Sequence, residues 1–158
     1  MSNLQKAHTS AEVILDKTLR STQGSRQFIN RFNNWTIESN VIWNKRKFKL
    51  HIKCRNSSLF QEFPTCYIKR SVFLEIISRS EMLKFSGEKS KYTDFLHTDY
   101  LVLQLLDFRC SKIGLEGKNF VFKGNIKRKN IEELSDLYWS LEEVCLNFNS
   151  FLESVKQN

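Results

Sequence analysis

The stretch WNKRKFKLHIKCR, residues 43–55, decides how the rest of this chain is interpreted. Basic and apolar side chains alternate along it, and a period of two is typical of a β-strand that buries one face. The apolar face of this predicted strand carries Phe48, Leu50, Ile52 and Cys54. From Lys45 onward, every side chain on the other face is basic or can become so: Lys45, Lys47, Lys49, His51, Lys53 and Arg55. We therefore predict a strand at 43–55 that turns its cations together toward solvent.

The composition fits one folded domain that spans residues 1–158. The chain is 41% hydrophobic, and its thirteen Phe and three Trp supply bulky core residues. Only five Gly and one Pro argue against disordered and collagen-like classes. A chain of this length buries about two-thirds of the surface that its unfolded form exposes. A sizeable hydrophobic core is expected.

Charge is distributed unevenly along the chain. Residues 1–130 contain 24 Lys or Arg against 11 Asp or Glu, a net charge of +13, whereas residues 131–158 contain one Lys against six acids, a net charge of −5. The total of +8 therefore understates how basic the body of the chain is. Such an asymmetry indicates the charge of a partner, not the fold.

The N-terminal residues MSNLQKAHTSAEVILDK have no long apolar segment and include two acids, which is not typical of a secretory signal. No run approaches the 18 or so apolar residues of a membrane span. We expect a cytoplasmic protein with no membrane partner.

The four cysteines show no metal-ligand spacing, so no metal or other cofactor is expected. Cys54, Cys66 and Cys145 lie on predicted apolar faces and should behave as small buried residues. A Cys54–Cys66 disulfide across a hairpin is the exception that we consider.

The predicted elements begin with a helical segment over residues 1–34. A capping box, Thr9 to Glu12, starts a helix at 11–21, and a short second helical piece carries Phe28, Ile29 and Phe32. Residues 35–128 are predicted to be mostly sheet, with an initial strand or extended lead-in at 35–42.

A returning strand at 65–70 is expected to pair antiparallel with the basic strand. If Cys54 faces Cys66, then Lys53 lies beside Tyr67 and His51 beside Lys69. A helix is predicted near 71–84, and residues 86–94 form a surface loop.

The apolar run YLVLQLLDF, residues 100–108, fits either a central strand or a short buried helix. We favour a strand, because a hairpin of 113–115 and 120–126 follows it. That hairpin should place Phe120, Phe122 and Ile126 on one face, with Lys123 and Lys127 on the other.

The last predicted helix covers residues 130–156, with Asn130 as its N-cap and Glu133 in its first turn. Its apolar positions alternate by three and four residues, as in a heptad seam. A second apolar stripe widens this face, which favours a helix that lies across the sheet of its own domain. The alternative is a homodimer or partner-helix seam over residues 131–155.

These elements predict an α+β fold, in which an antiparallel sheet of four to six strands packs against the long C-terminal helix. Shorter N-terminal and central helices complete the expected architecture.

The basic strand face is the leading functional candidate. Alternate residues on a strand lie about 6.5–7 Å apart, close to the phosphate spacing along a nucleic-acid strand. Trp43 and Tyr67 would offer stacking surfaces for unpaired bases, which favours single strands. The predicted binding residues are Trp43, Lys45, Lys47, Lys49, His51, Lys53, Arg55, Tyr67 and Lys69.

Two other interpretations of this face stay open. It can be the solvated outer side of a half-buried sheet, where Lys also prevents edge aggregation. It can also dock an acidic protein, as an inhibitor, immunity protein or adaptor would.

A second basic group, residues 127–129, precedes the acidic helix, and we favour a charged loop that pairs with Glu132 and Glu133 over an independent binding site. For catalysis only His97 and Asp99 stand out. No recognised catalytic motif accompanies them, so a non-enzymatic binding module with no catalytic residues is predicted.

Overall fold

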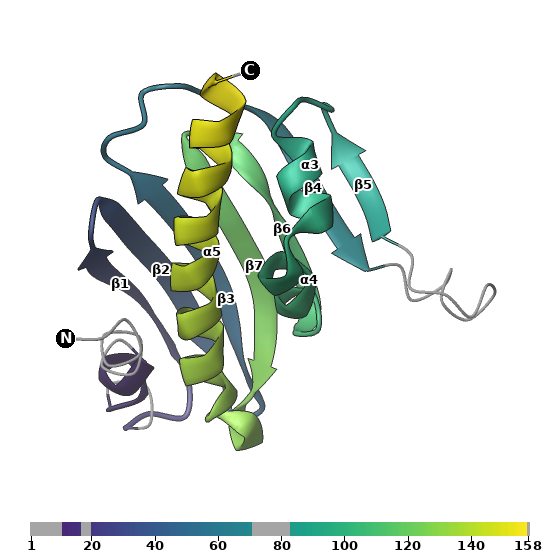
Figure 1. The fold of residues 1–158 in the computed structure, drawn as a ribbon. Helices are drawn as coiled ribbons and strands as arrows, with labels where there is room; N and C mark the ends of the chain where they lie inside the picture. Colours follow the sequence, from purple (N-terminus) through teal and green to yellow (C-terminus); the bar gives the residue numbers. More distant parts are fainter. Residues whose placement is uncertain (1–10, 17–19, 71–82, 158) are drawn as a thin grey trace.

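Helix α5, Glu133–Lys156, lies lengthwise across one face of a seven-stranded sheet in the computed structural model (Figure 1). The structure describes residues 11–16, 20–70 and 83–157. No helix within these ranges is both long and apolar enough to cross a bilayer.

The sheet is antiparallel throughout, in the order β1-β2-β3-β7-β6-β4-β5. The α+β class is confirmed, and the strand count slightly exceeds the predicted four to six. The strands are β1 Gly24–Phe32, β2 Trp35–Trp43, β3 Lys47–Asn56, β4 Phe63–Arg70, β5 Leu83–Gly87, β6 Arg109–Gly117 and β7 Asn119–Lys127.

The described helices all lie on the same side of the sheet (Figure 1). Two short ones, α3 (Thr93–Thr98) and α4 (Tyr100–Leu105), sit beside α5, and a 3₁₀ turn, η1 (Arg128–Asn130), leads into it. The predicted N-terminal helix is observed over residues 11–16, and residues 17–19 lie outside the described part. One face of the sheet is therefore covered, and no described helix covers the other.

Strand β3 confirms the predicted alternation of basic and apolar side chains. Its apolar positions are at most 1% exposed, whereas Lys47, Lys49 and Arg55 are exposed and His51 and Lys53 are half-buried. Residues 43–46, which were predicted to start this strand, instead end β2 and form the turn before β3.

The apolar face of α5 packs into the core of its own chain, which is the first of the two interpretations above. The positions that form this face are buried: Leu134, Leu137, Tyr138, Leu141, Val144, Cys145, Phe148 and Leu152. A homodimer through this helix stays a prediction.

Polar contacts tie α5 to three neighbouring strands. Tyr138 Oη lies 2.5 Å from Ser39 Oγ on β2, and Asn56 Nδ2 on β3 donates to Asn149 Oδ1 at 3.0 Å. Asn30 Nδ2 on β1 donates to Glu142 Oε1 at 3.4 Å. Buried polar groups need such partners, so these bonds fix where the helix sits on the sheet.

The start of α5 differs from the predicted N-cap. Asn130 belongs to η1, and its side chain donates to Glu133 Oε1 at 3.0 Å instead of capping the helix. The helix then begins at Glu133, after Glu132.

Two secondary-structure predictions are wrong. Residues 24–32 form strand β1, not a helical piece. The spacing of Phe28 and Phe32 misled the prediction, because residues four apart share one face in a helix and in a strand alike. The run 100–105 forms helix α4, not a strand. Asp99 caps this helix by accepting a hydrogen bond from the Val102 backbone N–H at 3.0 Å. A run that is apolar except for Gln104 has no period that distinguishes a helix from a strand, which is why the sequence did not predict the helix.

The predicted pairing of the basic strand with residues 65–70 is also wrong. Strand β4 exists, but it pairs with β5 and β6, while β3 pairs with β2 and β7. Cys54 and Cys66 therefore do not face each other, and all four cysteines are free thiols. Cys54 instead meets Cys145 of α5, a buried thiol whose pKa is raised by burial and then by that contact.

The predicted helix near 71–84 falls mostly outside the described residues, and its last two positions belong to strand β5. The predicted loop at 86–94 is shorter than expected, since β5 reaches Gly87 and α3 begins at Thr93. The hairpin of 113–115 and 120–126 is confirmed as part of β6 and β7.

Two aromatic rings lie over glycines on the neighbouring strand. Trp43 is paired with Gly24 on the covered face, and a Cβ on Gly24 would lie 2.5 Å from Trp43 Cζ2. Tyr67 is paired with Gly114, where a Cβ would lie 2.5 Å from Tyr67 Cδ1 and clash with the Cys66 carbonyl oxygen. Glycine is required at both positions, at Gly24 because the Trp43 ring occupies the space of a side chain, and at Gly114 because the Cys66 carbonyl oxygen and the Tyr67 ring both do.

The substitution Gly114→Ala should lower the free energy of unfolding by about 1–3 kcal/mol, the usual cost of overpacking. Urea denaturation measures this change. The matched control is Ser86→Ala, an exposed position opposite Tyr67 on β5, which should change stability by no more than about 0.5 kcal/mol. Equal effects of the two substitutions would contradict the close approach of the Cys66 backbone and the Tyr67 ring to Gly114.

Candidate nucleic-acid interface

The face of the sheet that the described helices leave uncovered, which we call the open face, is strongly basic. The strand registers place two acids there, Glu38 and Glu116. The same registers place eleven cations there, from six of the seven strands: Arg31, Lys47, Lys49, Lys53, Arg55, Lys69, Lys84, Arg109, Lys112, Lys123 and Lys127.

These side chains form two rows that cross at His51. One row follows β3 and is the row predicted from the sequence. The second runs across the strands, because His51 pairs with Lys123, Lys123 with Lys112, and Lys69 with Lys84. The register of β4 with β6 places Lys69 beside Lys112, so the second row is continuous.

Two groups in the transverse row show the electrostatic cost of this crowding. Burial, then the ammonium groups of Lys123 and Lys53, lowers the pKa of His51. Burial, then Lys123 and Lys69, lowers the pKa of Lys112. Both shifts mean that the positive form is disfavoured, so an anion placed here would relieve the repulsion.

Tyr67 lies beneath the lysines of this face. It is 8% exposed, and the Nζ atoms of Lys112 and Lys123 lie 3.7 and 5.2 Å from its ring centroid. Lys123 also pairs with Glu116 at 3.3 Å. The ammonium groups of Lys112 and Lys123 thus lie over the Tyr67 ring in cation–π contacts, which leaves little of the ring accessible.

The structure places most of the predicted binding residues together. Lys47, Lys49, His51, Lys53, Arg55 and Lys69 lie on the open face. Lys45 is exposed in the turn that precedes β3.

Trp43 is the exception, because it lies on the covered face, where it is 7% exposed and donates its Nε1–H to Ser21 Oγ at 3.1 Å. The predicted neighbours Lys53–Tyr67 and His51–Lys69 are wrong, since β7 and β6 separate β3 from β4.

The transverse row was not predicted from the sequence. Lys123 and Lys127 were correctly placed on the polar side of their hairpin, but nothing local relates them to His51, Lys112 or Lys84. Only the strand order, a long-range property, brings these side chains together.

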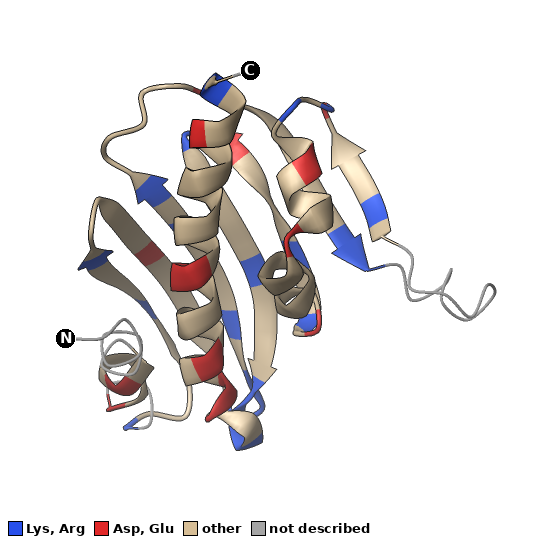
Figure 2. Ribbon diagram, in the orientation of Figure 1, with Lys and Arg blue, Asp and Glu red and all other residues tan. Residues whose placement is uncertain are grey.

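Acidic side chains gather on the opposite side of the molecule. Figure 2 shows acids along α5 in front of the sheet, and the helix carries Glu133, Asp136, Glu142, Glu143 and Glu153 against one Lys. Glu142 is buried in the core. The uneven charge of the sequence therefore becomes two faces of opposite sign.

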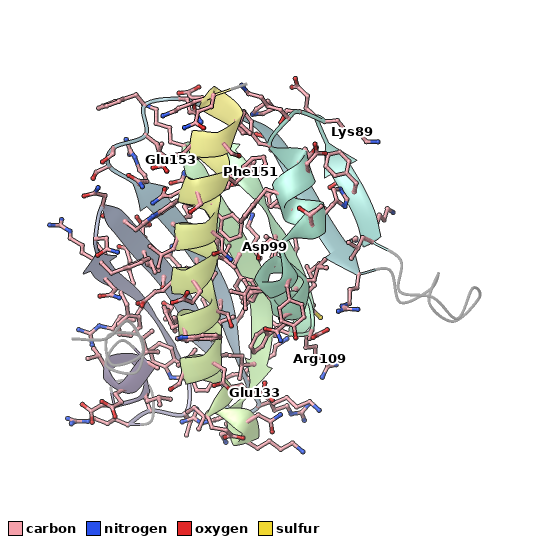
Figure 3. The ribbon with its side chains drawn as sticks, viewed as in Figure 1. Lys89, Asp99, Arg109, Glu133, Phe151 and Glu153 are labelled. Atoms are coloured by element: carbon pink, nitrogen blue, oxygen red, sulfur yellow. The ribbon has the colours of Figure 1, made fainter. Side chains whose placement is uncertain are left out.

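The catalytic candidates His97 and Asp99 have structural contacts. The His97 ring lies 5.9 Å from the Phe85 ring. Asp99, between α4 and α5 in Figure 3, accepts hydrogen bonds from the Val102 backbone and from Asn147 Nδ2 at 2.9 Å. The carboxylate thus caps α4 and ties it to α5.

NMR titration of the free protein should give a His51 pKa below 6.5, and Lys123→Gln should raise it. Because the folded state takes up this proton less readily than the unfolded chain, His51 should reduce the free energy of unfolding as the pH falls below about 6.5. The control Lys89→Gln lies in the loop between β5 and α3 and should leave this pKa unchanged (Figure 3). A His51 pKa at or above 6.5 would contradict the electrostatic description of the row.

Comparison of the chain with protein-family models, with curated proteins and with solved structures found no match. The geometry and charge of the open face therefore carry the functional argument by themselves.

Proposed function

We propose that this chain binds nucleic acid through the phosphate backbone, on the open face of its sheet. The observation that carries the proposal is the charge of that face, eleven cations against two acids, with no described helix over it. Each Lys or Arg that neutralises a phosphate releases condensed counterions, which supplies binding free energy without reading the sequence.

The dimensions of the face suit an extended polyanion. Cations along β3 recur about every 6.5–7 Å, and seven strands spaced about 4.8 Å apart make a surface roughly 29 Å wide. Contacts of this kind position a strand but do not distinguish its bases.

Base stacking is not part of the proposed mode. Trp43 lies on the covered face, and Tyr67 lies beneath Lys112 and Lys123. The preference for single strands depended on these two rings, so the proposed contacts apply to single strands and duplexes alike.

An acidic protein partner, the alternative from the sequence, fits the open face less well. The centres of protein–protein interfaces are depleted of Lys and enriched in exposed aromatic side chains. Among the described residues, the large apolar side chains exposed on this face are Ile29 and Ile42, near the β1 edge. A surface of lysines without accessible aromatics matches phosphate better than protein.

The proposed role is binding without catalysis, in a reducing compartment such as the cytoplasm. The four free cysteines are compatible with that setting, because structural disulfides are rare there.

The affinity for a single-stranded oligonucleotide should fall steeply with salt. Five phosphate contacts give a slope of log affinity against log salt of about −3.5, and Lys49→Gln/Lys53→Gln, which removes two of them, should reduce the slope to about −2.1. Fluorescence anisotropy over a series of salt concentrations measures both values.

The control Lys89→Gln/Lys91→Gln removes the same charge from the β5–α3 loop and should keep the slope of the unmodified protein. An unchanged slope and affinity in Lys49→Gln/Lys53→Gln would remove the open face from the proposal. A scrambled oligonucleotide of equal length should bind equally well, because no base contact is involved.

A further inference from the structure

A second cationic feature lies at the end of the sheet where the β2–β3 turn, the start of β6, the end of β7 and η1 meet. It is a cavity of about 750 Å³, which we call the end pocket. Seven of its ten lining residues are Lys or Arg, and none is an acid: Asn44, Lys45, Arg46, Lys47, Arg109, Cys110, Asn125, Lys127, Arg128 and Lys129.

Hydrogen bonds hold the wall of the end pocket in place. Asn44 Oδ1 accepts from the backbone N–H groups of Arg46 and Lys47 at 2.8 and 3.0 Å, which fixes the turn. The backbone N–H of Arg128 donates to the Arg46 carbonyl at 2.9 Å. The turn and η1 are thus joined directly.

The Arg128 guanidinium has a structural role in this wall. It donates to the carbonyl oxygens of Ser21, Thr22 and Asn44 at 3.0–3.4 Å and lies over the Phe48 ring. These contacts engage both of its terminal nitrogens. The other six cations, not Arg128, are therefore the candidates for ligand contacts.

The remaining cations have no acidic partner within the described part of the chain. The predicted ion pairs of residues 127–129 with Glu132 and Glu133 do not form among the described residues, where the ion pairs present join Arg20 to Asp16, Arg70 to Asp107 and Lys123 to Glu116. Like charges around a cavity repel one another, and a multiply charged anion inside it would offset that repulsion.

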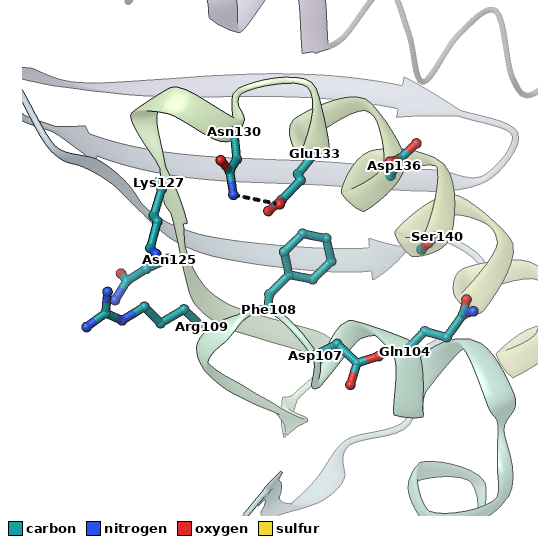
Figure 4. Close-up of a pocket in the computed structure, with 10 residues that line it drawn as sticks. All are labelled: Gln104, Asp107, Phe108, Arg109, Asn125, Lys127, Asn130, Glu133, Asp136 and Ser140. Atoms are coloured by element: carbon teal, nitrogen blue, oxygen red, sulfur yellow. Dashed lines mark hydrogen bonds between the residues drawn. The ribbon is translucent and has the colours of Figure 1, made fainter.

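A neighbouring cavity differs from the end pocket in its charge, because acids as well as cations line it. It shares Arg109, Asn125 and Lys127 with the end pocket, but acids of α5 and of the α4–β6 loop line its other side (Figure 4). Two of those acids are engaged, Asp107 by Arg70 at 2.6 Å and Glu133 by Asn130 at 3.0 Å. Arg109 and Lys127 form the boundary between the mixed cavity and the purely basic one.

The end pocket continues the β3 row, because Lys47 belongs to both. A strand whose backbone follows β3 would therefore bring its end to a concave, basic site. A phosphate monoester at that end carries a charge of about −1.5 to −2, more than the single charge of an internal diester. Concavity, position and charge all favour a chain end over an internal phosphate.

We propose that the end pocket binds the terminal phosphate of the nucleic-acid strand that lies on the open face. This inference rests on the proposed function. It adds a preference for phosphorylated ends to a face that is otherwise indifferent to sequence.

The test uses one oligonucleotide sequence with an internal fluorophore, bearing a 5′-phosphate, a 3′-phosphate or hydroxyl groups at both ends. One of the phosphorylated forms should bind about tenfold more tightly than the hydroxyl form, as expected for charge-assisted hydrogen bonds. Arg46→Gln/Lys129→Gln should abolish this difference and leave the affinity for the hydroxyl form nearly unchanged.

The matched variant Lys49→Gln/Lys53→Gln should weaken binding of all three forms by the same factor and keep the tenfold ratio. Lys89→Gln/Lys91→Gln should change neither value. Because Arg46, Lys129, Lys49 and Lys89 are exposed, we expect these variants to fold, and thermal unfolding verifies this.

Equal affinity of the unmodified protein for all three forms would overturn the end-pocket inference and leave the proposed function standing. No binding of any form would overturn both. Competition with inorganic phosphate tests whether the end pocket prefers a strand end to a free anion. If inorganic phosphate competes at the end pocket as strongly as the phosphorylated oligonucleotide, the strand-end inference is wrong.

Discussion

Burial of the apolar face of α5 against a single face of the sheet is the constraint on which the rest of the structure depends. Side chains alternate between the two faces of a strand, so covering one face assigns every second residue to the core. A slip of β3 by one residue would exchange Phe48 and Leu50 for lysines in that core, and isolated charges there would have to be desolvated at high cost. The contacts of Tyr138, Asn149 and Glu142 with β2, β3 and β1 hold the helix in register with this alternation. The basic open face is the counterpart of that packing.

Elements whose periodicity is local could be predicted from the sequence, and elements defined by distant partners could not. The basic strand, the β6–β7 hairpin and α5 each bury a regular series of side chains, so their patterns sufficed. Phe28 and Phe32 are four residues apart, a spacing that a helix and a strand satisfy equally, and only pairing with β2 decides in favour of β1. The run at 100–105 is apolar except for Gln104, so it shows no period that distinguishes a helix from a strand. The place of β4 beside β6 depends on strand order, which loop lengths do not specify.

The same division holds for the candidate site. The cations of β3 were predictable because they are neighbours on one strand. The burial of Trp43 and Tyr67 could not be predicted, because it depends on glycines in other strands. The Trp43 ring fills the space above Gly24, and the Tyr67 ring fills the space above Gly114. Small residues on a paired strand thus removed from solvent the two side chains that looked best suited to contact bases. The end pocket was not predicted for a related reason: residues 127–129 stand out as a basic group, but only the fold brings them beside the β2–β3 turn and the start of β6.

The separation of acids on α5 from cations on the open face gives the molecule an electric dipole moment along the direction that joins its two layers. The electric field of a polyanion would turn such a molecule before contact, with the basic open face toward the polyanion. Productive encounters would then be more frequent than random tumbling allows. The advantage fades once added ions shorten the Debye length to about 10 Å or less, below the dimensions of the domain itself.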